Sequence, residues 1–155
     1  SFPQSWEGKW RGTVEIWGFN KKVDAFPMSL EISPKDSSWN FIITYNRDEN
    51  VADERKYSLV RIQDSIGHYV IDEHNSILLD SYLYGDCLYS SFGGMGSELL
   101  TKICLENGFL EYEITSVFSE PKRVSGKEII RGDTIPEINS YEVYNIMKAK
   151  LIKEK

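Results

Sequence analysis

Ten short stretches of alternating apolar and polar residues follow one another along this chain, and most are joined by tight polar turns. Alternation with a period of two places every second side chain on the same face of a β-strand. Two-residue turn signals such as Gly85-Asp86 and Asn107-Gly108 join neighbouring stretches as antiparallel hairpins. An open meander of this length would leave two exposed edges, so we expect an all-β, up-and-down antiparallel β-barrel of about ten strands.

The expected strands cover 9–18, 25–33, 39–45, 55–63, 68–73, 77–84, 87–92, 98–106, 109–118 and 141–153. We assign them to a single domain spanning 1–155, because the length suits one domain and no longer repeat is present. The alternative is a two-sheet sandwich, but its crossing connections need longer loops than most of those present. One connection is long, 119–140. We expect it to border the barrel mouth as a lid or portal, or else to be an exposed, disordered connection.

The charge of the chain bears on its partners. There are 18 basic and 24 acidic residues, which give a net charge of −6. This argues against nucleic acid, because phosphate backbones attract clusters of Lys and Arg. No apolar run approaches the ~20 residues of a membrane-spanning helix. The chain starts at Ser1 without a Met, which fits a processed exported protein, periplasmic or secreted, or a trimmed chain; we expect export.

The two cysteines fall on neighbouring predicted strands. If Met95-Gly96 forms the turn between these strands, residue 94 pairs with 97, and the same register sets Cys87 opposite Cys104 on the outer face. A cross-strand disulfide and a pair of free thiols are both compatible with this placement.

The first predicted strand begins with the tripeptide Gly8-Lys9-Trp10. In this Gly-x-Trp motif and in its strand order, the chain resembles the lipocalins and their relatives in the calycin superfamily. The resemblance implies that Gly8 and Trp10 are structural, with Trp10 filling the closed end of the barrel after a short helical turn within 2–6. It also implies that a basic residue of the last strand, Lys148 or Lys150, packs across the Trp10 ring.

The alternation predicts an apolar interior. The alternatives are a ligand cavity and a filled core that binds nothing, and we favour the cavity because a barrel of ten strands is wide enough that side chains need not fill it. The candidate ligand-binding residues are Trp10, Phe26, Met28, Phe41, Tyr45, Arg61, Phe92 and Tyr112. The strand at 55–63 is ambiguous. Arg61 enters the cavity, as a carboxylate anchor, only if it faces inward with Tyr57; we favour the other face, with Val60 and Ile62 inside.

These features predict binding of a small hydrophobic or amphipathic molecule inside the barrel by a non-catalytic carrier or sensor. An alternative is a protein-interaction module with a filled barrel, in which exposed aromatic residues such as Trp17, Tyr82 and Tyr84 contact a partner. An enzyme with its site in the cavity is less favoured, because no nucleophile motif is present. His68 and Asp72 lie ~13 Å apart along one strand, too far to share a metal ion, so we expect neither a metal site nor another cofactor.

Overall fold

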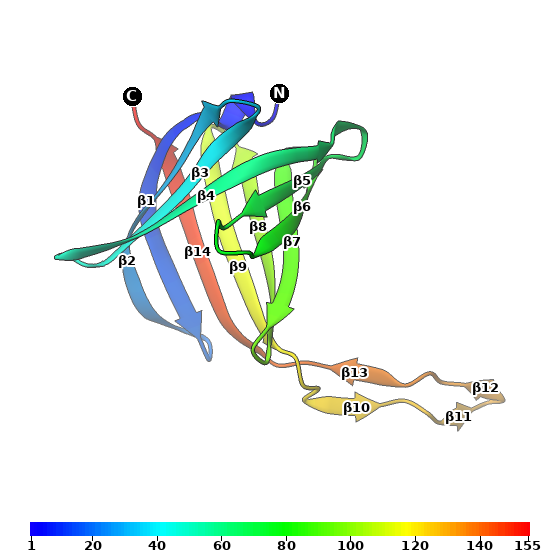
Figure 1. The fold of residues 1–155 in the computed structure, drawn as a ribbon. Helices are drawn as coiled ribbons and strands as arrows, with labels where there is room; N and C mark the ends of the chain where they lie inside the picture. The colour runs from blue at the N-terminus through cyan, green and yellow to red at the C-terminus, as the bar shows by residue number, and fades with distance from the viewer.

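The computed structural model of the protein describes residues 1–155 and shows a closed antiparallel β-barrel of ten strands (Figure 1). The strands are β1 (Gly8–Gly18), β2 (Lys21–Lys35), β3 (Ser38–Asp48), β4 (Val51–Gln63), β5 (His68–Asp72), β6 (Leu78–Tyr84), β7 (Cys87–Gly94), β8 (Ser97–Glu106), β9 (Phe109–Phe118) and β14 (Val143–Lys153). Each strand pairs with the next along the chain, and β14 closes the barrel by pairing with both β9 and β1. The predicted fold class is confirmed.

Alternation along the strands explains why the barrel closes around one core. In β3, four alternate side chains are buried, Trp39, Phe41, Ile43 and Tyr45, while their neighbours are less buried. Removing such side chains from water is favourable by about 1.5–3 kcal/mol each. Because all ten strands turn an apolar face inward, a single closed sheet buries these faces and leaves no free edge.

One end of the barrel, which we call the closed end, carries both chain termini (Figure 1). The helical turn η1 (Gln4–Trp6) precedes β1 and buries Trp6 completely in the core. The Phe2 ring packs edge-on against Trp6 and Tyr69, with centroids 4.7 and 4.9 Å away. The Trp10 indole N–H donates a hydrogen bond of 2.9 Å to the Trp6 carbonyl. Trp10 therefore fills the closed end after a short helical turn, as expected.

The cation over Trp10 differs from the expected one. The Lys153 ammonium lies 5.5 Å from the centre of a Trp10 ring, whereas Lys148 lies over Trp17, 4.8 Å away. The register explains the difference, because Trp10 pairs with Lys153 across β1 and β14. The assignment of Lys148 or Lys150 to this position was wrong, because the lysine over Trp10 lies three residues after Lys150 and five after Lys148.

Cys87 and Cys104 are joined by a disulfide between β7 and β8. The two residues are direct partners in the ladder, and Gly94 pairs with Ser97 at the turn. This is the register expected from a two-residue turn at 95–96, so the predicted geometry is confirmed. Of the two alternatives, a disulfide and a pair of free thiols, the structure has the disulfide.

Strand β4 turns towards the interior the face that the sequence analysis did not favour. Leu59 is fully buried and Tyr57 lines the interior, while Ile62 is 53 % exposed. Directly opposed residues of an antiparallel pair point to the same side, and here Trp39 pairs with Leu59. The inward residues of β3 therefore set the inward face of β4. Placing Val60 and Ile62 in the interior was wrong, because both belong to the face opposite Leu59.

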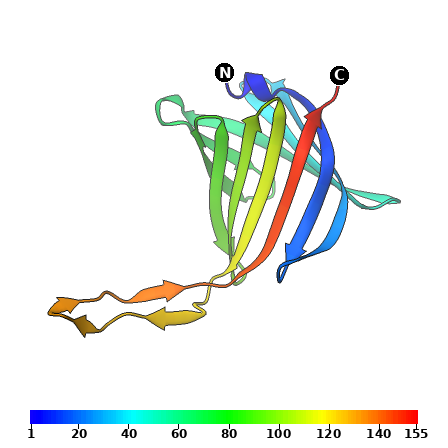
Figure 2. The same ribbon diagram turned by 180° about the vertical axis from the view of Figure 1, so that it is seen from behind.

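The long connection folds into a narrow hairpin arm that extends away from the barrel (Figures 1 and 2). Its two small ladders join β10 (Arg123–Ser125) to β13 (Ile138–Ser140) and β11 (Ile129–Ile130) to β12 (Asp133–Thr134). The arm leaves the barrel at the end opposite the termini, which we call the mouth. It is neither a lid nor a structureless connection, because its two halves pair with each other instead of folding back over the mouth.

The two helical segments, η1 and η2 (Asp64–Ile66), have three residues each, and the structure contains no helix that could cross a membrane.

Candidate functional site

The half of the barrel nearest the mouth is hollow, whereas the closed half is filled. Two cavities of about 170 and 610 Å³ lie among the inward side chains of the strands. The smaller is bounded mainly by β3 to β9 and the larger by β2, β3, β4, β8, β9 and β14. Both touch Tyr45, Arg55, Leu99 and Ile114, so they are neighbouring parts of one interior. The larger has the volume of a typical small-molecule site.

A pair of tyrosines spans the interior; both line the smaller cavity, and Tyr45 also lines the larger one. The Tyr45 hydroxyl on β3 and the Tyr112 hydroxyl on β9 are 2.6 Å apart and hydrogen-bonded, and both residues are buried. Since β3 and β9 are not neighbours in the barrel, this bond crosses the lumen. We call the pair the tyrosine bridge. Two hydroxyls carry two hydrogens and the bond between them uses one, so the other can be donated to a guest.

Burial extends to higher pH the range over which the tyrosine bridge stays protonated. It raises the pKa of Tyr112 well above its ordinary value near 10, and the neighbouring Tyr45 raises it further. Burial also raises the pKa of Tyr45, an effect that the hydrogen bond to Tyr112 and the charge of Arg55 only partly oppose. At neutral pH the bridge is therefore an uncharged group that can both donate and accept hydrogen bonds.

A charged pair stands beside the bridge on β4. The Arg55 guanidinium lies 4.9 Å from the centre of the Tyr45 ring, a cation–π arrangement. Its Nη2 donates to the Asp53 carboxylate at 3.0 Å. On the other side, Tyr57 and Glu73 line the smaller cavity; burial, followed by the Glu73 charge, raises the pKa of Tyr57. The polar groups therefore form one cluster, while most of the remaining wall is apolar.

The predicted ligand-binding residues divide into two groups. Phe26, Phe41, Tyr45, Phe92 and Tyr112 line one or both cavities. The other three, Trp10, Met28 and Arg61, line neither cavity. Trp10 and Met28 are buried in the core, and Arg61 lies at the closed end, where its guanidinium contacts the Trp39 and Tyr69 rings.

Sequence reasoning missed the charged residues that line the two cavities, which are Arg47, Asp48, Asp53, Arg55 and Glu73. Arg55 was expected to be the first residue of its strand, but β4 begins four residues earlier, at Val51. Arg55 is two residues before Tyr57, so it shares the same face of the strand. Correct assignment of the inward face of β4 would have found it.

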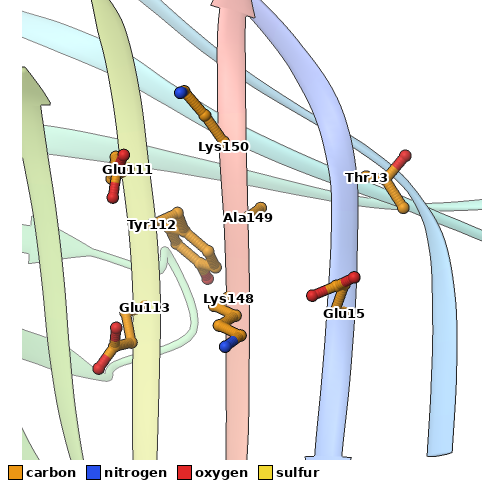
Figure 3. Close-up of a pocket in the computed structure, with 8 residues that line it drawn as sticks. All are labelled: Thr13, Glu15, Glu111, Tyr112, Glu113, Lys148, Ala149 and Lys150. Atoms are coloured by element: carbon orange, nitrogen blue, oxygen red, sulfur yellow. The ribbon is translucent and has the colours of Figure 1, made fainter. Parts of the chain in front are cut away.

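A second hollow, of about 410 Å³, lies on the outer wall over β1, β14 and β9 (Figure 3). Its walls are charged side chains, with Lys148 paired in register between Glu15 and Glu113, and Lys150 beside Glu111. Opposite charges directly across strands stabilise a sheet modestly. This charge pattern accounts for the outer hollow as a solvated face of the barrel, and we place the candidate site inside.

The structure holds no group of three or more His, Cys, Asp or Glu side chains arranged to bind a metal ion. The two histidines make other contacts: His68 hydrogen-bonds Asp80 at 2.7 Å, and His74 hydrogen-bonds Ser58 at 2.7 Å.

The sequence matches no protein-family model and no curated protein. The class of the protein is therefore defined by its architecture. It is a closed, ten-stranded, antiparallel up-and-down β-barrel whose interior is filled at one end and hollow at the other.

Proposed function

We propose that this protein binds a small hydrophobic or amphipathic molecule in the hollow half of its barrel, as a non-catalytic carrier or sensor of lipocalin-like, calycin type. The observation that carries the proposal is the pair of neighbouring cavities at the tyrosine bridge, of which the smaller is lined by both tyrosines and the larger by Tyr45. The mostly apolar wall of the smaller cavity suits the body of such a guest, and the mixed wall of the larger cavity, which carries charged residues beside Phe26 and Met147, suits its polar end.

The flexible and aromatic side chains around the larger cavity fit this role. Phe26 and Met147 line it, and Met147 has an unbranched chain that adapts to guests of different shape. The spare hydroxyl hydrogen of the bridge and the nearby Arg55 favour a guest with an oxygen acceptor at one end.

Native mass spectrometry of the purified protein tests the proposal. We expect a retained guest as excess mass over the denatured protein, and a hydrophobic fluorophore, 8-anilinonaphthalene-1-sulfonate, to bind with one site per chain once any guest is removed. An unchanged native mass, together with no fluorescence increase, would contradict the proposal.

Two neighbouring positions on β9 locate the binding. Ser116 is buried and lines the larger cavity, whereas Thr115 belongs to the opposite face. Ser116→Phe should fill the cavity and weaken fluorophore binding at least tenfold. Thr115→Phe, the matched control, should leave it unchanged. Equal effects of the two variants would place the fluorophore outside the barrel.

A further inference from the structure

Two hairpin turns at the mouth carry bulky apolar residues in a strained conformation. Phe19 begins the β1–β2 turn at φ 51° with 82 % of its surface exposed, and Met95 begins the β7–β8 turn at φ 54° with its side chain fully exposed. A positive φ at this turn position suits Asn, Asp or Gly, whereas a bulky residue there is an outlier. Each residue thus has both an unfavourable backbone and an unfavourable exposure.

Two hairpin turns at the closed end carry no bulky residue at positive φ. The β8–β9 turn is Asn107-Gly108, with both residues at positive φ, and the β6–β7 turn is Gly85-Asp86, whose glycine has positive φ. These are the residues that such turns prefer, and they are polar or lack a side chain. Single exposed apolar residues are ordinary on protein surfaces. What indicates a functional surface is the combination of exposure and backbone strain in the bulky apolar residues of two mouth-end turns, β1–β2 and β7–β8.

The arm adds a third apolar projection at the mouth. Ile129 and Ile130 are both exposed, and they precede the Arg131-Gly132 turn at its tip. Figures 1 and 2 show the arm leaving the barrel at the end where the β1–β2 and β7–β8 turns lie. We call Phe19, Met95, Ile129 and Ile130 the mouth-end tips.

We propose that the mouth-end tips dock the barrel on the surface of a zwitterionic lipid bilayer. The tips are single side chains on separate turns and on the arm, and Met95 is as exposed as it would be in an extended peptide. A folded partner would need a matching surface for each projection, whereas a fluid bilayer interface receives isolated apolar side chains without one.

Charge selects the type of lipid. Basic and acidic residues are mixed beside the tips, with Lys21, Lys22 and Asp24 after Phe19, and both signs again in the arm. The whole chain has a net charge of −6, which opposes approach to an anionic surface. A headgroup carrying both charges suits this pattern best. Docking in this orientation would also bring the larger cavity, which is lined by Val51 and Arg47 near the mouth, towards the bilayer.

Co-sedimentation with phosphatidylcholine vesicles tests the docking. We expect the wild-type protein to pellet with the vesicles, and to bind vesicles containing phosphatidylglycerol less tightly. The double variant Phe19→Asn/Met95→Asn should bind phosphatidylcholine at least ~10-fold more weakly, because it removes two apolar side chains. Asn suits the turn conformation, so the same variant should unfold at a higher temperature than the wild type. Misfolding could not then explain its loss of binding.

The closed end supplies a matched control. Ile66→Asn/Tyr84→Asn also removes two exposed apolar side chains, one from η2 and one from the end of β6, and should bind vesicles like the wild type. The proposal is overturned if the wild type does not pellet, or if the control loses as much binding as the mouth-end variant. It is also overturned if light scattering shows a dimer that only the mouth-end variant abolishes, because a second copy would then be the occupant. None of these readouts depends on a guest in the cavity.

Discussion

Removing one hydroxyl of the tyrosine bridge should cost more stability than removing both. Tyr112→Phe leaves the Tyr45 hydroxyl buried without its partner at 2.6 Å, and Tyr45→Phe does the same to Tyr112. Loss of a buried hydrogen-bond partner costs about 1–3 kcal/mol. The double variant replaces both oxygens with apolar surface of nearly the same shape, so we expect it to lie within about 0.5 kcal/mol of the wild type.

Urea unfolding followed by tryptophan fluorescence measures this double-mutant cycle. With singles near 1.5 kcal/mol and a double near zero, the coupling energy is about −3 kcal/mol, within the range known for residues in contact. Each single variant should also melt about 3–6 °C below the wild type. Purely additive losses would refute the reasoning, because they would show that the two hydroxyls do not depend on each other across the lumen.

Three other outcomes follow from the packing. Cys87→Ser/Cys104→Ser opens a link between residues 17 apart, so the free energy of unfolding should fall by about 3 kcal/mol in a urea titration. Gly12→Ala would drive its new Cβ into the Lys150 carbonyl at the β1–β14 seam; a loss of about 3 kcal/mol is expected, and an unchanged melting temperature would contradict the close approach. Burial raises the pKa of both tyrosines of the bridge above 10, so the unfolded chain releases these protons first as the pH rises. Their contribution to stability should be complete below pH 10 and decline above it. When the free energy of unfolding is measured between pH 8 and 11, the double Phe variant should not show this decline.

Several features of the site could not be predicted from the sequence, because they depend on how distant strands meet in the closed barrel. Tyr45 and Tyr112 were both expected in the interior, but their bond depends on how far the closed sheet brings β3 and β9 towards each other. The position of Lys153 over Trp10 depends on the register in which the last strand meets the first, which no hairpin turn defines. The same holds for the β4 face that carries Arg55, since it follows from the pairing with β3.

The sequence by itself determined the local structure. Alternation with a period of two specified the strands of the barrel, the turn residues specified their hairpins, and the Met95-Gly96 turn placed Cys87 opposite Cys104. Only the tertiary structure decided which half of the interior is filled, which polar groups meet there, and that 119–140 extends as an arm. The physical reason is the range of the interactions along the chain. A turn sets the register of the two strands that it joins, whereas contacts across the lumen depend on every strand register around the barrel.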